Sequence, residues 1–259
     1  MPEAVFRFYG SLNDFFTPKR NPAKQKNVFN GERKSPPEFI RRFKSGDTVK
    51  DSIEAIGVVH PEVNLILANN TPVGFSYLLQ PNDRIAVYPE FCNIELPSDY
   101  TLRPPLEYPP RFIADIHLGR LVKYLRLFGF DILYDPKLDD ADLSRISAQQ
   151  NRVILSRDTL LLKRKEIIYG YRIRATNPRE QIREIITRYA LKDYAKPMSR
   201  CLVCNTSLVE LHNPDEIERL VPPCSRPHFD MYFYCKTCDK AYWKGHHYDN
   251  MRGILEEGE

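Results

Sequence analysis

Two C-x-x-C turns, C-L-V-C and C-K-T-C, hold the most specific chemical pattern in this chain of 259 residues. A C-x-x-C turn lets two thiolates reach one metal ion, and two such turns complete a tetrahedral four-sulfur site. We therefore predict a structural Zn²⁺ bound by Cys201, Cys204, Cys235 and Cys238. Two disulfides or a dithiol redox pair fit less well, because we expect no secretory signal and redox motifs rarely come as matched pairs.

A second set of candidate residues consists of acids at the ends of predicted elements. Asp115 and Asp158 each end a predicted strand, while Asp139, Asp140 and Asp142 open a predicted helix. Ligands of a parallel α/β sheet bind beyond the carboxyl ends of its strands, so we expect these acids to meet at one edge. Oxygen ligands without a matching histidine favour Mg²⁺ or Mn²⁺, which can activate a water for phosphodiester cleavage. For each aspartate taken singly, a helix cap is the alternative role.

Basic residues are concentrated in the middle of the chain. Residues 111–200 contain 19 Lys and Arg against 11 Asp and Glu, whereas residues 1–110 contain 13 of each kind and residues 201–259 contain 6 against 10. Such a surplus is typical of a region that meets a polyphosphate, although an ordinary solvated surface explains it equally well. Candidate contacts to substrate phosphates are Arg120, Lys123 and Arg126, on one side of a predicted helix, and Arg157.

The elements that must position these residues alternate between strand and helix after residue 110. We predict strands at 111–115, 131–134, 152–158 and 171–175. Between the first two strands we predict an amphipathic helix that ends at Gly129. A second helix begins with the acidic residues after the second strand and ends at Asn151. Asn177, Pro178 and Glu180 then begin a third helix, as its N-cap, first and third residues. This alternation predicts right-handed crossovers and a parallel sheet.

The first 95 residues follow another pattern. Strands at 5–9, 64–68 and 84–88 surround one helix, with Thr48 as its N-cap and Gly57 after its end, so we predict a single helix packed on a mixed sheet. Residues 96–110 are proline-rich and read as a linker. Residues 17–44, with nine Lys and Arg against two Asp and Glu, are predicted to be a long basic loop, solvated rather than bound to nucleic acid.

No membrane or export segment is expected. No apolar run approaches the roughly 20 residues that span a bilayer. The strand-like V-F-R-F-Y follows Met1 so closely that it leaves no room for a signal peptide. We expect a cytoplasmic protein without a membrane partner.

Several motifs together resemble a known family. R-F-I-A-D-I-H-L-G-R-L, L-S-R-D-T-L-L, C-L-V-C-N and C-K-T-C-D-K-A-Y-W resemble the Mut-seven C-terminal RNase family over about residues 111–255. The resemblance implies a PIN-like nuclease fold that carries a zinc ribbon. F-R-F-Y-G-S-L-N-D-F and A-V-Y-P-E-F resemble the ubiquitin-like β-grasp domain often fused ahead of it. The expected fold class is thus an α/β PIN-like parallel-sheet domain (111–198) with a C-terminal zinc ribbon (199–259), preceded by a linker (96–110) and an α+β ubiquitin-like β-grasp domain (1–95).

The resemblance assigns roles to individual acids. Asp115 matches the acid at the end of the first PIN strand, and Asp158 matches the acid of the family's T-R-D, where this chain has Ser156 in place of Thr. Asp140 is our choice for the middle acid, with Asp139 and Asp142 as alternatives. Glu180 is a candidate for the fourth acid that PIN nucleases generally have.

The same resemblance points to a metal-dependent ribonuclease with RNA as its partner. His247 matches a histidine near the family's C-terminal motif, where it either binds phosphate or makes a structural hydrogen bond. The alternative is a non-catalytic RNA-binding or adaptor protein that retains a PIN-like fold and zinc ribbon. Binding of Mg²⁺ or Mn²⁺ at the aspartates separates the two, because only the enzyme needs it.

Overall fold

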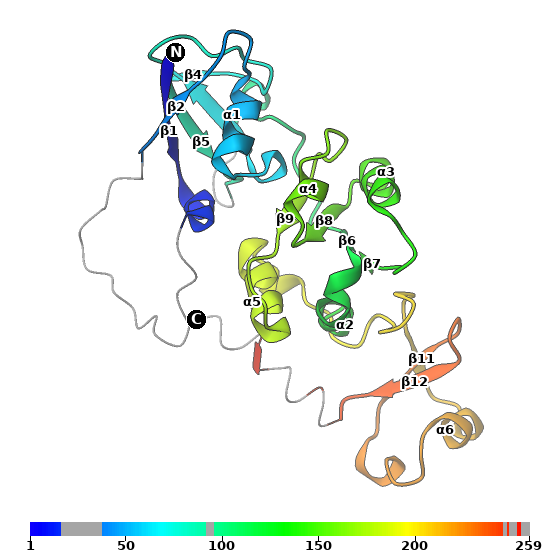
Figure 1. Cartoon of the computed structure of the whole chain (residues 1–259). Helices are drawn as coiled ribbons and strands as arrows, with labels where there is room; N and C mark the ends of the chain where they lie inside the picture. Colours follow the sequence, from blue (N-terminus) through cyan, green and yellow to red (C-terminus); the bar gives the residue numbers. More distant parts are fainter. Residues whose placement is uncertain (17–37, 92–95, 246–247, 249–252, 255–259) are drawn as a thin grey trace, which may run out of the picture. The chain divides into compact units, whose positions relative to one another are not determined.

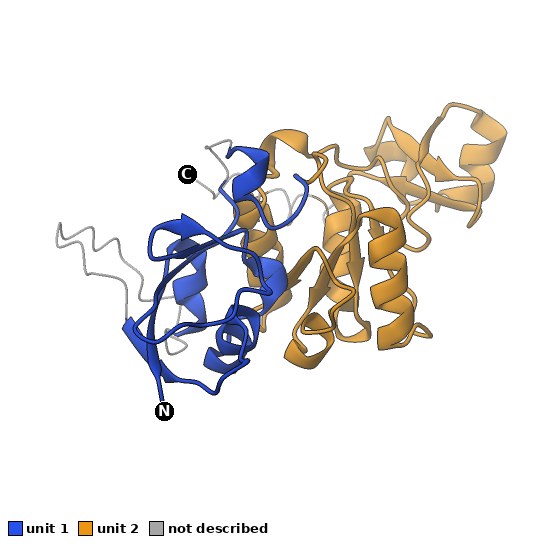
Figure 2. Ribbon diagram, turned by 90° about the horizontal axis from the view of Figure 1, so that it is seen from above, with its two compact units in different colours: residues 1–105 blue, residues 106–259 orange. Residues whose placement is uncertain are grey.

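The computed structural model describes residues 1–16, 38–91, 96–245, 248 and 253–254, and it divides into two compact units, residues 1–105 and 106–259 (Figure 2). Most of the predicted basic loop lies outside the described residues. The prediction was wrong for the last part of that loop. Glu38–Arg42 form a strand, and the backbone of this strand pairs antiparallel with that of the first strand. In the part of the chain that is described, no helix is long and apolar enough to cross a bilayer.

The N-terminal unit is a five-stranded mixed sheet with one helix, as predicted. Its strand order is β2-β1-β5-β3-β4, with β1 and β5 parallel and the other pairs antiparallel. The elements are β1 (Glu3–Phe8), β2 (Glu38–Arg42), α1 (Val49–Ile56), β3 (Leu65–Ala68), β4 (Thr71–Pro72) and β5 (Arg84–Tyr88). Alternate residues of β1, such as Phe6 and Phe8, are fully buried in one core with Val49 and Ile53 of α1.

The ends of α1 follow the sequence signals. Thr48 and Asp51 form a reciprocal capping box, which satisfies two backbone N–H groups that the helix leaves open. Gly57 ends the helix with a φ of 117°, in the left-handed region that favours glycine.

The C-terminal unit contains the predicted parallel sheet, with strand order β7-β6-β8-β9 (Figure 1). Its elements are β6 (Phe112–Ala114), α2 (Gly119–Leu127), β7 (Ile132–Leu133), α3 (Asp140–Gln150), β8 (Val153–Ser156), α4 (Thr159–Leu162), β9 (Gly170–Arg172) and α5 (Pro178–Arg188). The chain leaves β6 toward β7 and leaves β8 toward β9, so the connections diverge between these two central strands. In open α/β sheets such a switch point is where ligands bind.

Apolar side chains of α2 hold that helix on the sheet. Leu121, Val122 and Leu125 are buried in one core with residues of α5 and of the strands, which confirms the predicted amphipathic helix. Gly129 follows with a φ of 88°, and a Cβ there would lie 2.2 Å from the carbonyl oxygen of Lys196. Only glycine fits this close approach.

The last part of the unit is a small three-stranded antiparallel sheet with order β10-β11-β12. Its elements are β10 (Val209–Leu211), α6 (Pro214–Leu220), β11 (Tyr232–Cys235) and β12 (Lys240–Trp243). A small core of Leu211, Val221 and Tyr232 supports it. Short 3₁₀ helices elsewhere are η1 (Gly10–Phe15), η3 (His60–Glu62), η4 (Ser98–Tyr100), η5 (Ile116–Leu118), η6 (Lys192–Tyr194) and η7 (Arg226–His228).

Candidate functional site

The four predicted cysteine ligands come together in one group. The Sγ atoms of Cys201, Cys204, Cys235 and Cys238 all lie within 4.8 Å of one another. Sulfurs that surround a zinc ion at about 2.3 Å lie roughly 3.8 Å apart, and Cys204 and Cys235 are 3.5 Å apart. The group could therefore hold a metal ion, and four sulfur donors in a tetrahedral set favour zinc.

Backbone turns bring each pair of cysteines to the same point. Asn205 and Asp239 follow the second cysteine of their turns, and both have left-handed φ angles, of 67° and 50°. The thiols do not ionise alike. Burial raises the pKa of Cys204, but hydrogen bonding to Thr206 outweighs it and lowers that pKa to about 6, whereas the hydrogen bond with Cys204 raises the pKa of Cys238 to about 12. A bound cation would allow all four to be thiolates.

Arg126 connects the first cysteine turn with the parallel sheet through hydrogen bonds. Its guanidinium donates to the carbonyl oxygens of Val203 at 2.7 Å, Leu202 at 3.2 Å and Ile132 at 3.0 Å. The residue is 3% exposed, and burial lowers the pKa of its guanidinium. Arg126 was predicted to contact RNA because it lies three residues from Lys123, but its side chain turns inward to these carbonyls. It is a structural residue here, and we leave it out of the proposed RNA contacts.

A second anchor connects the same turn with β7. The Asn205 amide accepts from the backbone N–H of Ile132 at 3.2 Å and donates to Asp131 at 2.9 Å. Asp131 also accepts from Arg152 at 2.7 Å and lies 3.6 Å from the guanidinium of Arg200. Burial alone would raise the pKa of Asp131, but the hydrogen bonds from Arg152 and Asn205 lower it below its usual value.

Two of the three predicted catalytic acids follow the strands on either side of the switch point of the parallel sheet. Asp115, which follows β6, is 6% exposed and accepts from the backbone N–H of His117 at 2.9 Å. Asp158, which follows β8, accepts from the N–H of Leu160 at 2.7 Å. The fully buried Ser156 joins them: its hydroxyl donates to Asp115 and accepts from the backbone N–H of Asp158 at 2.9 Å.

The third acid and its alternatives lie at the start of α3. Asp140 is exposed at the first position of the helix, where it has no hydrogen bond linking it to Asp115 or Asp158 among the described residues. Asp139 is the N-cap and accepts from the N–H of Asp142 at 2.8 Å, while Asp142 pairs with Arg145. Over the described ranges, the cysteine group is the sole set of three or more potential metal ligands within 4.8 Å. The three-aspartate site thus stays a prediction.

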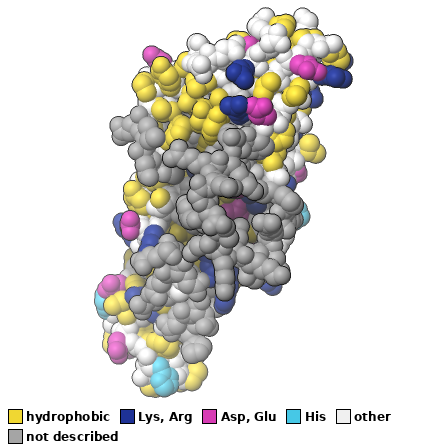
Figure 3. Space-filling view, turned by 90° about the vertical axis from the view of Figure 1, so that its left-hand side faces the viewer, with side chains coloured by type: hydrophobic (Ala, Val, Ile, Leu, Met, Phe, Trp, Pro, Cys, Tyr) yellow, Lys and Arg dark blue, Asp and Glu magenta, His cyan; other side chains and the backbone are white. Residues whose placement is uncertain are grey.

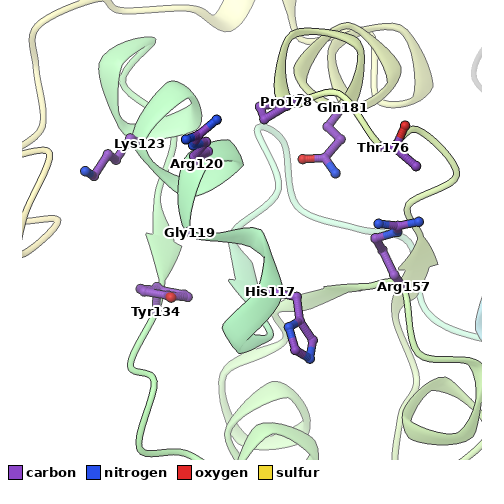
Figure 4. A pocket seen from close by; sticks show the side chains of 9 residues that line it. All are labelled: His117, Gly119, Arg120, Lys123, Tyr134, Arg157, Thr176, Pro178 and Gln181. Carbon is purple, nitrogen blue, oxygen red and sulfur yellow. The ribbon is translucent and has the colours of Figure 1, made fainter.

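A cavity of about 500 Å³ opens at the same edge of the sheet (Figure 4). Three of the predicted RNA contacts line it: Arg120 and Lys123 on α2, and Arg157 at the end of β8. Arg120 and Arg157 stand on opposite sides of the opening in Figure 4. All three side chains are exposed, and within the described part of the chain none forms a salt bridge or side-chain hydrogen bond.

Other residues of the cavity were not predicted from the sequence. Its lining is completed by His117, Gly119, Tyr134, Thr176, Pro178 and Gln181. Tyr134 directly follows β7, whereas the other five lie on the segments three to nine residues beyond the ends of β6 and β9. Extending the strand-end rule from acids to the polar residues of these segments would have found part of the lining. His247 lies outside the described residues. Glu180 does not complete the predicted capping box, because Asn177 accepts instead from the N–H of Arg179.

Two family models match this chain. Residues 110–255 match the Mut7-C RNAse domain, and residues 1–95 match the Mut7-C ubiquitin domain. The first matched segment contains the parallel sheet and the cysteine group, and the second contains the mixed sheet of the N-terminal unit. Neither a curated protein nor a solved structure matches the chain.

Proposed function

Because this chain belongs to the Mut7-C RNAse domain family, we propose that it is a metal-dependent ribonuclease that hydrolyses RNA phosphodiester bonds. The observation that carries the proposal is the cation-lined cavity at the switch point, directly beside two acids. His117 and Arg157, which line the cavity, are each within two residues of Asp115 or Asp158. The cationic side chains bind the RNA phosphates, and the carboxylates bind the metal ion that the reaction needs.

The carboxylates at the switch point suit a hard cation. In both Asp115 and Asp158 one oxygen is fixed by a backbone N–H, which sets the direction of the other. Asp140 is our proposed third ligand from the start of α3. When bound there, Mg²⁺ or Mn²⁺ would supply a water of lowered pKa and a positive charge for the leaving oxygen.

This chain's own groups orient the substrate. Arg120, Lys123 and Arg157 fix the RNA backbone by charge-assisted hydrogen bonds, so that one linkage lies over Asp115. Ser156 keeps the two acids in a fixed relation. The cysteine group has a separate, structural role: a zinc ion bound by four sulfurs leaves no open position for substrate.

A non-catalytic RNA-binding protein is the competing function, favoured by one observation. Among the described residues that line the cavity there is no Asp or Glu, so an RNA could bind without meeting a catalytic group. The two functions differ in their need for a divalent metal at the acids.

Incubation of the purified, zinc-loaded protein with end-labelled RNA pools, with Mn²⁺ or without added divalent metal, tests the proposal. We expect metal-dependent cleavage that Asp115→Asn and Asp158→Asn abolish, because asparagine keeps the cap but removes the charge. RNA binding should persist or strengthen, since an anion facing phosphate has gone. Asp215→Asn, an exposed acid of α6 outside the cavity, is the matched control and should cleave normally. Equal cleavage by wild type and Asp158→Asn would refute the assignment of the catalytic site to these aspartates.

A further inference from the structure

We propose that the cavity takes the end of an RNA chain and binds its terminal phosphate, a phosphomonoester. This inference rests on the proposed function, because it names the class of RNA that the same site accepts. It goes further in stating that an internal linkage alone is a poor ligand for this cavity.

The charge in the cavity is unbalanced. Arg120, Lys123 and Arg157 bring three positive charges to its wall, and no carboxylate lines it among the residues described. Elsewhere on the same unit basic side chains pair with acids, as Arg145 pairs with Asp142 on α3. On the face shown in Figure 3, Lys and Arg side chains likewise lie beside Asp and Glu. Three unpaired cations around one opening repel each other, and a bound anion relieves that repulsion.

Two helices begin at the same cavity. Gly119 is the first residue of α2 and Pro178 is the first residue of α5, and both line the wall. Helix N-termini carry a partial positive charge, which favours an anion. At α5 this charge acts without a free N–H at the first two positions, because Pro178 has no N–H and that of Arg179 donates to Asn177. Thr176, just before α5, adds a hydroxyl that can donate to a phosphate oxygen. These groups add to the three cations, which are the main determinant.

The amount of positive charge selects a terminal phosphate. A phosphodiester carries one negative charge, whereas a phosphomonoester carries about two near neutral pH. A terminal phosphate together with the next diester thus carries roughly three charges, which matches the three cations in number. The volume, about 500 Å³, lies in the range of pockets for small ligands and suits one nucleotide rather than a through-running strand.

Binding of mononucleotides to the full-length protein tests the inference without any cleavage. The probes are adenosine 5′-monophosphate, adenosine 3′-monophosphate and adenosine, measured by titration calorimetry on the zinc-loaded protein without added Mg²⁺ or Mn²⁺. We expect at least one monophosphate to bind and adenosine not to bind. Arg120→Gln and Arg157→Gln should each weaken that binding about tenfold, the effect of one lost charge-assisted contact. Both side chains are exposed, so the fold should survive.

Arg145→Gln, which removes the same charge from the exposed face of α3, is the matched control and should bind like wild type. Comparison of the two monophosphates shows whether the 5′ or the 3′ end enters. Equal binding of adenosine and both monophosphates, or wild-type binding by the two cavity variants, would overturn the inference.

Cleavage assays on RNAs with a terminal phosphate or a terminal hydroxyl keep the two proposals apart. Phosphate-selective binding without any cleavage refutes the ribonuclease but supports the binding site. Equally fast metal-dependent cleavage of phosphorylated, hydroxyl-ended and circular RNAs supports the ribonuclease and refutes end recognition.

Discussion

The cysteine group and the aspartate edge are two candidate metal sites within one unit, and they are assembled to different degrees. The four sulfurs already lie within 4.8 Å of each other, on two turns that each need only four residues. The acids come from β6, β8 and the start of α3, and only Asp115 and Asp158 are joined, through Ser156. The cysteine site belongs to a sheet with a small core, so its assembly is coupled to metal binding, whereas the acids stand on a parallel sheet that a large core stabilises without metal.

The largest effect should come from removing a cysteine ligand. Cys235→Ala should abolish zinc binding and unfold β10–β12 while the parallel sheet remains, because binding energy in such sites is folding energy. Metal analysis and hydrogen exchange measure the two consequences. Cys224, an exposed thiol outside the group, supplies the control, and Cys224→Ala should keep its zinc. Full protection of β11 in the zinc-free Cys235 variant would break the contrast drawn above.

The second-largest effect should come from removing Arg126, which connects the first cysteine turn with the parallel sheet. Arg126→Leu removes the donor from the buried carbonyl oxygen of Ile132 and from the partly exposed carbonyl of Val203, which should lower the free energy of unfolding by about 3 kcal/mol. Urea unfolding provides the measurement. Lys165→Gln, which changes an exposed residue, is the control and should leave the urea midpoint unchanged. An unchanged midpoint for Arg126→Leu would show that the turn does not depend on this anchor.

Ser156 tests the aspartate edge directly. Ser156→Ala removes the hydroxyl that connects the two acids and should reduce kcat roughly tenfold with little change in KM, because it positions the carboxylates rather than the RNA. Ser156→Thr keeps a hydroxyl and should restore most of the rate. If alanine and threonine give the same kcat, the hydroxyl has no positioning role.

The smallest effect should be a change in how the stability of the folded protein depends on pH in the acid range. The pKa of Asp131 is lowered in the folded protein, so its stabilisation is present above its unfolded pKa of about 3.9 and is lost as the pH falls through the folded value. Asp131→Asn should therefore be less stable at pH 7 and should lose less stability than wild type below pH ~4. Thermal unfolding across that range shows whether the two curves converge.

Sequence reasoning succeeded where the determinants were local. The C-x-x-C spacing, the Thr48 capping box and the glycine after α1 each act over a few residues, and all were found in place. It failed for Arg126, whose periodicity on α2 resembled that of Lys123, because two of its carbonyl partners, Leu202 and Val203, lie 76 and 77 residues further along the chain. Asp140 stays undecided for the same reason, since its approach to β6 and β8 depends on tertiary placement of the loop before α3.

Helix α2 belongs to both regions. Arg120 and Lys123 on its early turns line the cavity, and Arg126 on its last turn holds the cysteine turn. If metal release shifts α2, the cavity changes with it, and the proposed zinc and RNA sites would then be linked. Linkage is reciprocal: the factor by which zinc raises the affinity for a phosphorylated RNA end must equal the factor by which that RNA raises the affinity for zinc. The protein would then bind its metal most tightly while its substrate is bound.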